Sequence, residues 1–99
     1  MYAHGQGVRQ DYVEAVKWYR KAAEQGVVEA QYRVGLRYSQ GQGVPKNIVQ
    51  AYMWWGLAAS DGHLKADAFL DRATKSMTPA QISEAKKLAR EWWAKHKRK

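Results

Sequence analysis

The sequence contains no cysteine and only two prolines among its 99 residues. Without cysteine it has no disulfide, no thiolate metal site and no cysteine nucleophile, and its redox compartment stays undetermined. No run of alternating β-branched residues predicts a sheet. No segment approaches the roughly 20 apolar residues that span a bilayer, and the first ten residues lack the apolar core of a secretion signal. We therefore expect a soluble chain, whose compartment the sequence does not reveal.

The aromatic residues are numerous but unevenly chosen, with five Trp and six Tyr beside a single Phe. Many small Ala and Gly residues stand between them. Alanine lets helix backbones approach each other, and a large ring fills the remaining gap, so this combination is typical of helix-on-helix packing. A chain of this length forms one domain with a modest core. The composition predicts an all-α protein.

Positive charge is in excess, and most of the excess lies near the C-terminus. The net charge is +8. Residues 80–99 carry seven Lys or Arg against two Glu, and four of the seven are Lys95, Lys97, Arg98 and Lys99. A basic end of this kind is usually a solvated face. It also leaves open an alternative function, which is binding to nucleic acid or to an anionic surface through the basic C-terminal helix.

An internal repeat organises the chain. Shifting the sequence by 36 positions gives 12 identities in 34 aligned pairs, where chance would give about two. The run Gly5-Gln6-Gly7-Val8 falls on Gly41-Gln42-Gly43-Val44, and Trp18 falls on Trp54. Self-similarity at such a period is typical of helical repeat proteins. Because Trp18 and Trp54 occupy equivalent positions, we expect both of them in the core.

The residue pattern of each repeat unit predicts two helices, one on either side of a glycine. After the Gly-x-Gly-Val run, Asp11 or Asn47 can cap a helix by accepting hydrogen bonds from free backbone N–H groups. In the first copy, apolar residues then recur at spacings of three and four, which places them on one helix face. Gly26 is positioned to end this helix, as a glycine just after the last turn commonly does.

The second helix of the unit carries Ala30, Val34 and Tyr38 at spacings of four, which predicts that they share one face. Gly41 and Gly43 follow it. The chain must turn back at this point and needs a positive φ, which glycine adopts at little cost. The sequence therefore predicts a helix, a glycine turn and a further helix in succession.

The repeat resembles the Sel-1-like repeat family, which is related to tetratricopeptide repeats. The motif appears as Ala30, Val34-Gly35, Tyr38 and Gly41-Gln42-Gly43-Val44, followed by Ala51, Trp54-Trp55, Ala58-Ala59 and Gly62. The resemblance covers about residues 2–70, with Val34 where leucine is usual. It implies an α/α superhelix, a short solenoid of antiparallel helix pairs. It also implies a non-catalytic interaction module, an adaptor or scaffold that binds a segment of a partner protein.

The resemblance divides the chain into two parts. Residues 1–77 comprise a half repeat, one full repeat and one decayed repeat, in which Asp71 stands at the position of Gly35. Residues 78–99 are expected to form a C-terminal capping helix with a basic tail. The half repeat predicts apolar surface on the helix over residues 11–25, through which we expect copies of the chain to associate.

Residues 78–81 (Thr-Pro-Ala-Gln) are a strong start signal for the capping helix. Thr78 is the predicted N-cap, Pro79 the first helical residue and Gln81 the partner in a capping box. The apolar residues beyond it fall on a single stripe: Ile82, Ala85, Ala89, Trp92, Trp93 and His96. A one-sided helix of this kind can seal the exposed core at the end of a solenoid.

The sequence contains no recognisable catalytic or metal-binding constellation. His4, His63 and His96 are far apart, and none belongs to a metal-binding pair. The two Gly-x-Gly runs neither continue to Lys-Ser/Thr nor follow a strand, so they predict structural turns and not phosphate loops. We therefore expect no enzyme activity, no metal and no cofactor.

The resemblance places partner binding on the concave face of the superhelix, which the first helix of each pair lines. By analogy with tetratricopeptide arrays, the groove positions are Glu29, Tyr32, Leu36, Ser39 and Gln40, with Lys65, Ala68, Arg72, Lys75 and Ser76 in the decayed repeat. This basic, partly aromatic strip suits an acidic segment or a C-terminal carboxylate. The alternative interpretation is an ordinary solvated surface.

Overall fold

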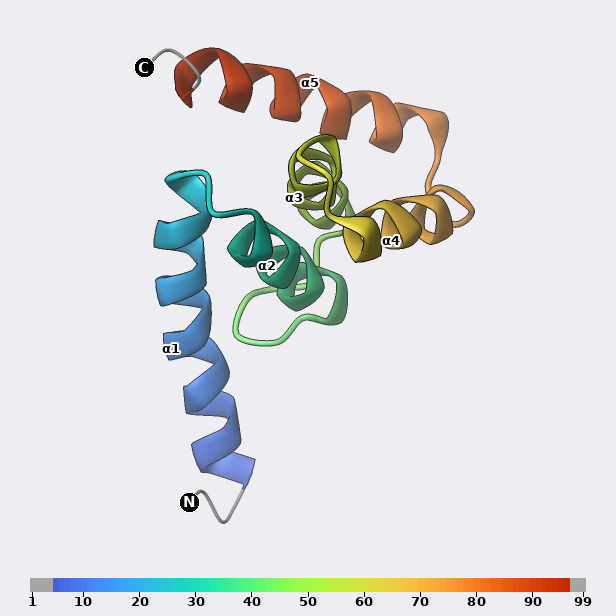
Figure 1. Cartoon of the computed structure of the whole chain (residues 1–99). Coiled ribbons are helices and arrows are strands. Elements are labelled where there is room, and N and C mark those ends of the chain that lie inside the picture. Colours follow the sequence, from blue (N-terminus) through green and yellow to red (C-terminus); the bar gives the residue numbers. More distant parts are fainter. Residues whose placement is uncertain (1–4, 97–99) are drawn as a thin grey trace.

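The computed structural model describes residues 5–96, which fold into five α-helices with no strand among them. The helices are α1 (Gly5–Glu24), α2 (Val28–Gln40), α3 (Ile48–Ser60), α4 (Leu64–Thr74) and α5 (Pro79–His96). The first four pack against each other in chain order, and α5 returns to lie across α3 (Figure 1). The predicted all-α helical solenoid is confirmed. None of the helices within residues 5–96 is long and apolar enough to cross a membrane.

The helix α3 forms the centre of the molecule because α2, α4 and α5 all pack against it. Such a helix is apolar around most of its circumference, since little of its surface remains in contact with water. Its buried residues are Ala51, Tyr52, Met53, Trp54, Trp55, Leu57 and Ala58. The core of the protein is therefore built around α3, which positions α2, α4 and α5 relative to one another.

A glycine notch lets α2 and α3 approach closely. A Cβ atom added at Gly35 would overlap the indole of Trp55. The same indole donates a buried hydrogen bond from Nε1 to the backbone carbonyl of Tyr32, at 3.2 Å. The residues predicted to share one face of α2 are all buried: Ala30, Val34 and Tyr38. The helical periodicity thus predicted the buried face of α2, but not the close approach at Gly35.

The turn between α2 and α3 uses its glycines as predicted. Gly41 and Gly43 have φ values of 69° and 83°. Asn47 caps α3, because its side chain accepts a hydrogen bond from the backbone N–H of Gln50 at 3.1 Å. A Cβ atom at Gly43 would lie 2.6 Å from the carbonyl carbon of Tyr12. This turn therefore packs against α1 as well as reversing the chain.

The first copy of the glycine motif does not form a turn, and the prediction that Asp11 caps a helix is wrong. α1 begins at Gly5 and runs without interruption through Asp11 to Glu24. In the second copy, the turn is closed by α2, whose Tyr38 carbonyl accepts the N–H of Asn47 at 2.9 Å. The same Gly-Gln-Gly-Val run is therefore helical at the start of α1 and forms a turn after α2.

The prediction that Trp18 lies in the core is also wrong. Trp54 is 2% exposed, whereas Trp18, its equivalent in the repeat, is 68% exposed. The physical reason is the position of α5. Trp92 of α5 meets Trp54 edge-on, with 6.1 Å between ring centroids, whereas α5 packs on α3 and not on the face of α1 that carries Trp18.

The helix α5 begins at Pro79, as the sequence predicts. The backbone N–H of Gln81 donates to Thr78 Oγ1 at 3.1 Å, and the Thr78 N–H donates to Gln81 Oε1 at 3.0 Å, which completes the capping box. Four residues of the predicted stripe pack on the core: Ile82, Ala85, Ala89 and Trp92. Trp93 and His96 are more exposed than that stripe implies, because they lie at the rim of a hollow near the helix end.

Candidate partner-binding surface

The residues predicted to bind a partner lie on α2 and α4, which are joined by stacked rings. Tyr32 on α2 stacks with His63, the residue before α4, at 4.5 Å between ring centroids. It also stacks with Phe69 on α4 at 5.8 Å. Trp55 of α3 lies against Phe69 as well, at 5.2 Å. We call this the α2–α4 surface, made of Glu29, Tyr32, Leu36, Ser39, Gln40, Lys65, Arg72 and Lys75.

Tyr32 supports the α2–α4 surface from beneath and offers a partner little accessible area. Its side chain is only 8% exposed, since it is held between His63 and Phe69. Stacked aromatic pairs contribute about 0.5–1.5 kcal/mol beyond the area they bury. The Tyr32 ring therefore fixes the spacing of α2 and α4, and the neighbouring residues supply most of the accessible atoms.

The cationic part of the surface lies on α4 and on Lys75, the residue directly after it. Lys65, Arg72 and Lys75 are all exposed, and within residues 12–96 none of them forms an ion pair. The Arg72 guanidinium lies over Phe69, 5.2 Å from the ring centroid, which orients it without neutralising it. Asp71, one turn before Lys75, is also exposed and offsets part of the positive charge. The face still presents cations that are free to bind a carboxylate.

The predicted residues of α2 contribute differently. Gln40 is exposed, whereas Leu36 and Ser39 are half-buried. The Ser39 hydroxyl donates to the Leu36 carbonyl at 2.9 Å, so its hydrogen is already used within the helix. Leu36 packs at the edge of the core. Among these residues, Gln40 is the one whose side chain is best placed to reach a partner.

A polar contact ties the start of α2 to the start of α4. His63 caps α4, because its Nδ1 accepts the backbone N–H of Ala66 at 3.1 Å. Since Nδ1 is an acceptor, the neutral ring carries its hydrogen on Nε2 and donates it to Glu29 Oε1, at 2.8 Å. Arg33 contacts the other oxygen of Glu29 at 3.0 Å. The His63 hydrogen bond, with help from Arg33, holds the pKa of Glu29 below its ordinary value.

The comparison with known families fits this geometry. The model for the Sel1 repeat matches residues 1–27 and 28–63. The chain belongs to the Sel1 repeat family. The second match contains the whole of α2 and α3, the pair with the glycine notch and the glycine turn. Sel1 repeats are generally protein–protein interaction modules and are typically non-catalytic. A search of curated proteins returned no match.

The histidines of this Sel1 protein have structural partners in the part of the chain that can be described. His63 belongs to the Glu29 contact, and His96 stacks on Trp92 with 4.2 Å between ring centroids. His4 lies outside the described residues. No group of three His, Asp or Glu side chains within residues 12–96 is arranged to hold a metal ion.

Two residues that support the α2–α4 surface, Phe69 and His63, were not predicted from the sequence. Phe69 is the only Phe in the chain, and it joins the rings of α2, α3 and α4. His63 was assigned no role. The sequence feature that could have predicted its contact with Glu29 is their separation of 34 positions. This is close to one repeat, and residues one repeat apart are neighbours in a solenoid.

Proposed function

We propose that this Sel1 protein is a non-catalytic adaptor that binds an acidic segment of a partner protein on the α2–α4 surface. The observation that carries the proposal is a set of three exposed cations, Lys65 and Arg72 on α4 and Lys75 directly after it. None of them forms an ion pair with a described residue. A partner carboxylate would supply the opposite charge. Arginine binds a carboxylate through two parallel hydrogen bonds, which adds direction to the attraction.

Reversing the charge of the α2–α4 surface should weaken binding of an acidic segment. The test compares Arg72→Glu/Lys75→Glu with Lys86→Glu/Lys87→Glu, a control that changes the net charge equally on exposed residues of α5. The probe is a fluorescein-labelled octaglutamate peptide, and the readout is fluorescence anisotropy at about 0.15 M salt. We expect the surface variant to bind at least about tenfold more weakly and the control to bind within about threefold of the parent.

The opposite pattern would support the alternative function. If the α5 control loses most of the affinity and the Arg72→Glu/Lys75→Glu variant retains it, anions bind the basic C-terminal helix. Equal losses in both variants would mean that the peptide responds to net charge alone, and the proposed site would be wrong. Circular dichroism of both variants should match that of the parent, because all four side chains are exposed.

We further propose that residues 78–99 cap the repeats of residues 1–77. Support comes from the position of α5, which lays its apolar stripe across α3. Its outer face carries charged, exposed residues, among them Lys86, Lys87, Arg90, Glu91 and Lys95. A helix with one apolar and one charged face can cover a core on one side and remain in contact with water on the other.

A third proposal concerns self-association through α1. Trp18 is exposed in a shallow hollow of about 380 Å³ formed by residues of α1 alone. The rim carries both charge signs, with Glu14 and Glu24 beside Lys17, Arg20 and Lys21. In a two-fold dimer the same patch meets itself, so a patch with both signs is complementary to its own copy. A second copy of the chain is therefore the occupant that we propose.

Sedimentation velocity at about 100 µM should reveal association of the parent chain, and Trp18→Glu should abolish it. Leu64→Glu is the matched control, because Leu64 is another large exposed apolar side chain, 82% exposed, at the start of α4. We expect this control to associate like the parent. A monomeric parent, or a loss of association in the Leu64→Glu variant but not in the Trp18→Glu variant, would refute the α1 interface.

A further inference from the structure

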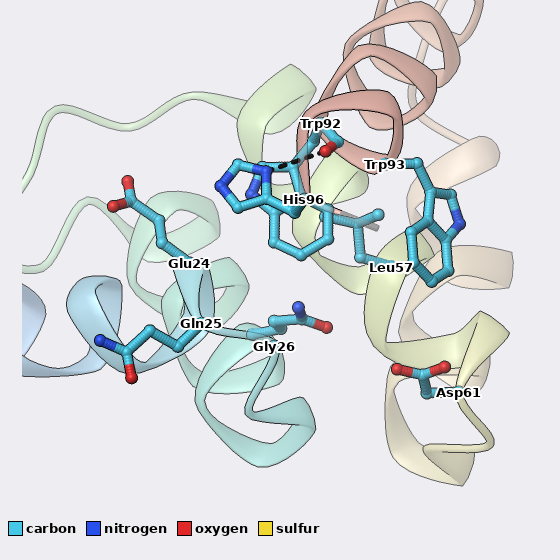
Figure 2. Close-up of a pocket in the computed structure, with 9 residues that line it drawn as sticks. Glu24, Gln25, Gly26, Leu57, Asp61, Trp92, Trp93 and His96 are labelled. Carbon is cyan, nitrogen blue, oxygen red and sulfur yellow. Dashed lines mark hydrogen bonds between the residues drawn. The ribbon is translucent and has the colours of Figure 1, made fainter. Parts of the chain in front are cut away.

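A pocket of about 350 Å³ opens where the ends of three helices meet, on residues outside the α2–α4 surface. Figure 2 shows Glu24 on one side, Asp61 on the other, and the rings of Trp92, Trp93 and His96 between and above them. Gln31 of α2 also lines the pocket, together with Gln25, Gly26 and Leu57. The pocket thus combines carboxylates, aromatic rings and an amide in one concave site.

The polarity of the backbone favours a cation in this pocket. α1 ends at Glu24, α3 ends at Ser60 and α5 ends at His96, so three helix C-termini contribute to the lining, against one N-terminus, that of α2 between Gly26 and Gln31. Each C-terminus carries about half a negative charge from its aligned peptide dipoles. Asp61 adds a full negative charge, and it forms no ion pair within residues 12–96. Glu24 adds a second, partly balanced by Arg20 at 3.4 Å.

A buried amide in the lining lacks a hydrogen-bond donor. Gln31 is 1% exposed, and its Nε2 donates to the Ala23 carbonyl at 3.2 Å. The reversed amide would place oxygen against oxygen, so the orientation is fixed. It leaves Gln31 Oε1 buried, with no hydrogen-bond partner among the described residues. An unsatisfied buried acceptor is costly, and a ligand that donates N–H would satisfy it.

The aromatic wall supplies two further features. Trp92 stacks on His96 at 4.2 Å between centroids, and the His96 Nδ1 lies 2.9 Å from the Trp92 carbonyl. Indole faces attract cations. The Trp92 Nε1 is buried and has no acceptor among the described residues. The lining therefore contains an unpartnered acceptor on Gln31 and an unpartnered donor on Trp92.

We propose that this pocket binds an arginine residue of a partner protein. The guanidinium carries the charge that Asp61, Glu24 and the helix C-termini favour. Its planar face can stack on an indole of the lining, that of Trp92 or Trp93. Its several N–H groups can donate to Gln31 Oε1 and to a carboxylate at once. A lysine ammonium has no flat face to stack. The backbone carbonyl of the same arginine residue supplies an acceptor for Trp92 Nε1, which a free guanidinium ion cannot do.

The test uses the full chain labelled with ¹⁵N and the peptide acetyl-Gly-Arg-Gly-amide, with the citrulline peptide as the neutral isostere. The indole N–H resonance of Trp92, assigned with a Trp92→Phe variant, should shift on titration with the arginine peptide. We expect the citrulline peptide to bind at least about tenfold more weakly, because it lacks the charge. Asp61→Asn should weaken arginine binding about fivefold, as should Gln31→Met through the loss of the acceptor.

The control is Asp71→Asn, which removes an equal charge from an exposed residue of α4 and should leave the affinity within about twofold of the parent. Equal binding of arginine and citrulline, or equal losses in Asp61→Asn and Asp71→Asn, would overturn the proposal. A gain of about fivefold or more on changing Lys97, Arg98 and Lys99 to Gln would identify the chain's own basic end as the occupant and would overturn it as well.

Discussion

Replacing Trp54 with alanine should lower the free energy of unfolding by about 3–5 kcal/mol, the range for a large buried ring cut back to a methyl group. Trp54 is 2% exposed, lies in the most buried helix and meets Trp92 across the α3–α5 contact. Its removal leaves a cavity that close-packed neighbours cannot fill. Denaturation by urea, followed by circular dichroism, measures the change.

The matched control is Trp18→Ala, the same substitution at the equivalent position of the other repeat copy. Because Trp18 is 68% exposed, its loss should change the free energy of unfolding by no more than about 0.5 kcal/mol, at concentrations where the chain is monomeric. Equal effects at Trp54 and Trp18 would contradict the burial difference. They would mean that Trp18 on α1 is buried in solution to the same extent as Trp54 on α3.

Gly35→Ala should destabilise the protein by about 1–3 kcal/mol, the usual cost of forcing an extra group into a packed core. The added Cβ atom would overlap the indole of Trp55, which cannot move freely because its Nε1 is hydrogen-bonded to the Tyr32 carbonyl. α2 and α3 would have to separate. Their contact is at the centre of the fold, so the melting temperature should fall.

Gly56→Ala is the control for this substitution. Gly56 lies inside α3, and a Cβ atom added there meets no atom within 4 Å. Alanine is favoured over glycine in a helix by about 0.8–1.0 kcal/mol, so this variant should be more stable than the parent. The two changes are chemically identical and are expected to have opposite signs. A stabilising Gly35→Ala substitution would refute the close approach at the notch.

The sequence predicted those features that neighbouring residues determine. The Asn47 cap, the Thr78 capping box and the turn at Gly41 and Gly43 each depend on groups within a few positions along the chain. Helical periodicity also identified the buried face of α2. These signals are local because a hydrogen-bonded turn is closed by residues three or four apart.

The predictions that failed depend on helices that are distant in sequence. Trp18 and Trp54 carry the same local signal, and only the position of α5 decides which one is buried. The glycine motif forms a turn where it follows α2 and is helical at the start of α1, although its residues are the same. Sequence similarity between repeats predicts equal environments, whereas α1 packs on α2 and α3 packs on α2, α4 and α5.

In the candidate site, too, the features set by neighbouring residues were predicted and those set by distant helices were not. Exposure of Lys65 and Arg72 followed from their positions on a helix. The Glu29–His63 contact joins two helices and needed the superhelical stacking to be known. The pocket at Asp61 was harder still to predict from the sequence. The ends of α1, α3 and α5 meet there because of the direction in which α5 crosses α3 (Figure 1).

The notch at Gly35 has a consequence for elongation of the solenoid. In the third copy, the residue at this position is Asp71, so α4 has a side chain where α2 has a socket for an indole. α5 packs on α3 and makes little contact with α4. An indole on a further helix could not lie against α4 at position 71 as Trp55 lies against Gly35, because the Asp71 side chain occupies that place. A designed extension of this array would begin by restoring glycine at position 71.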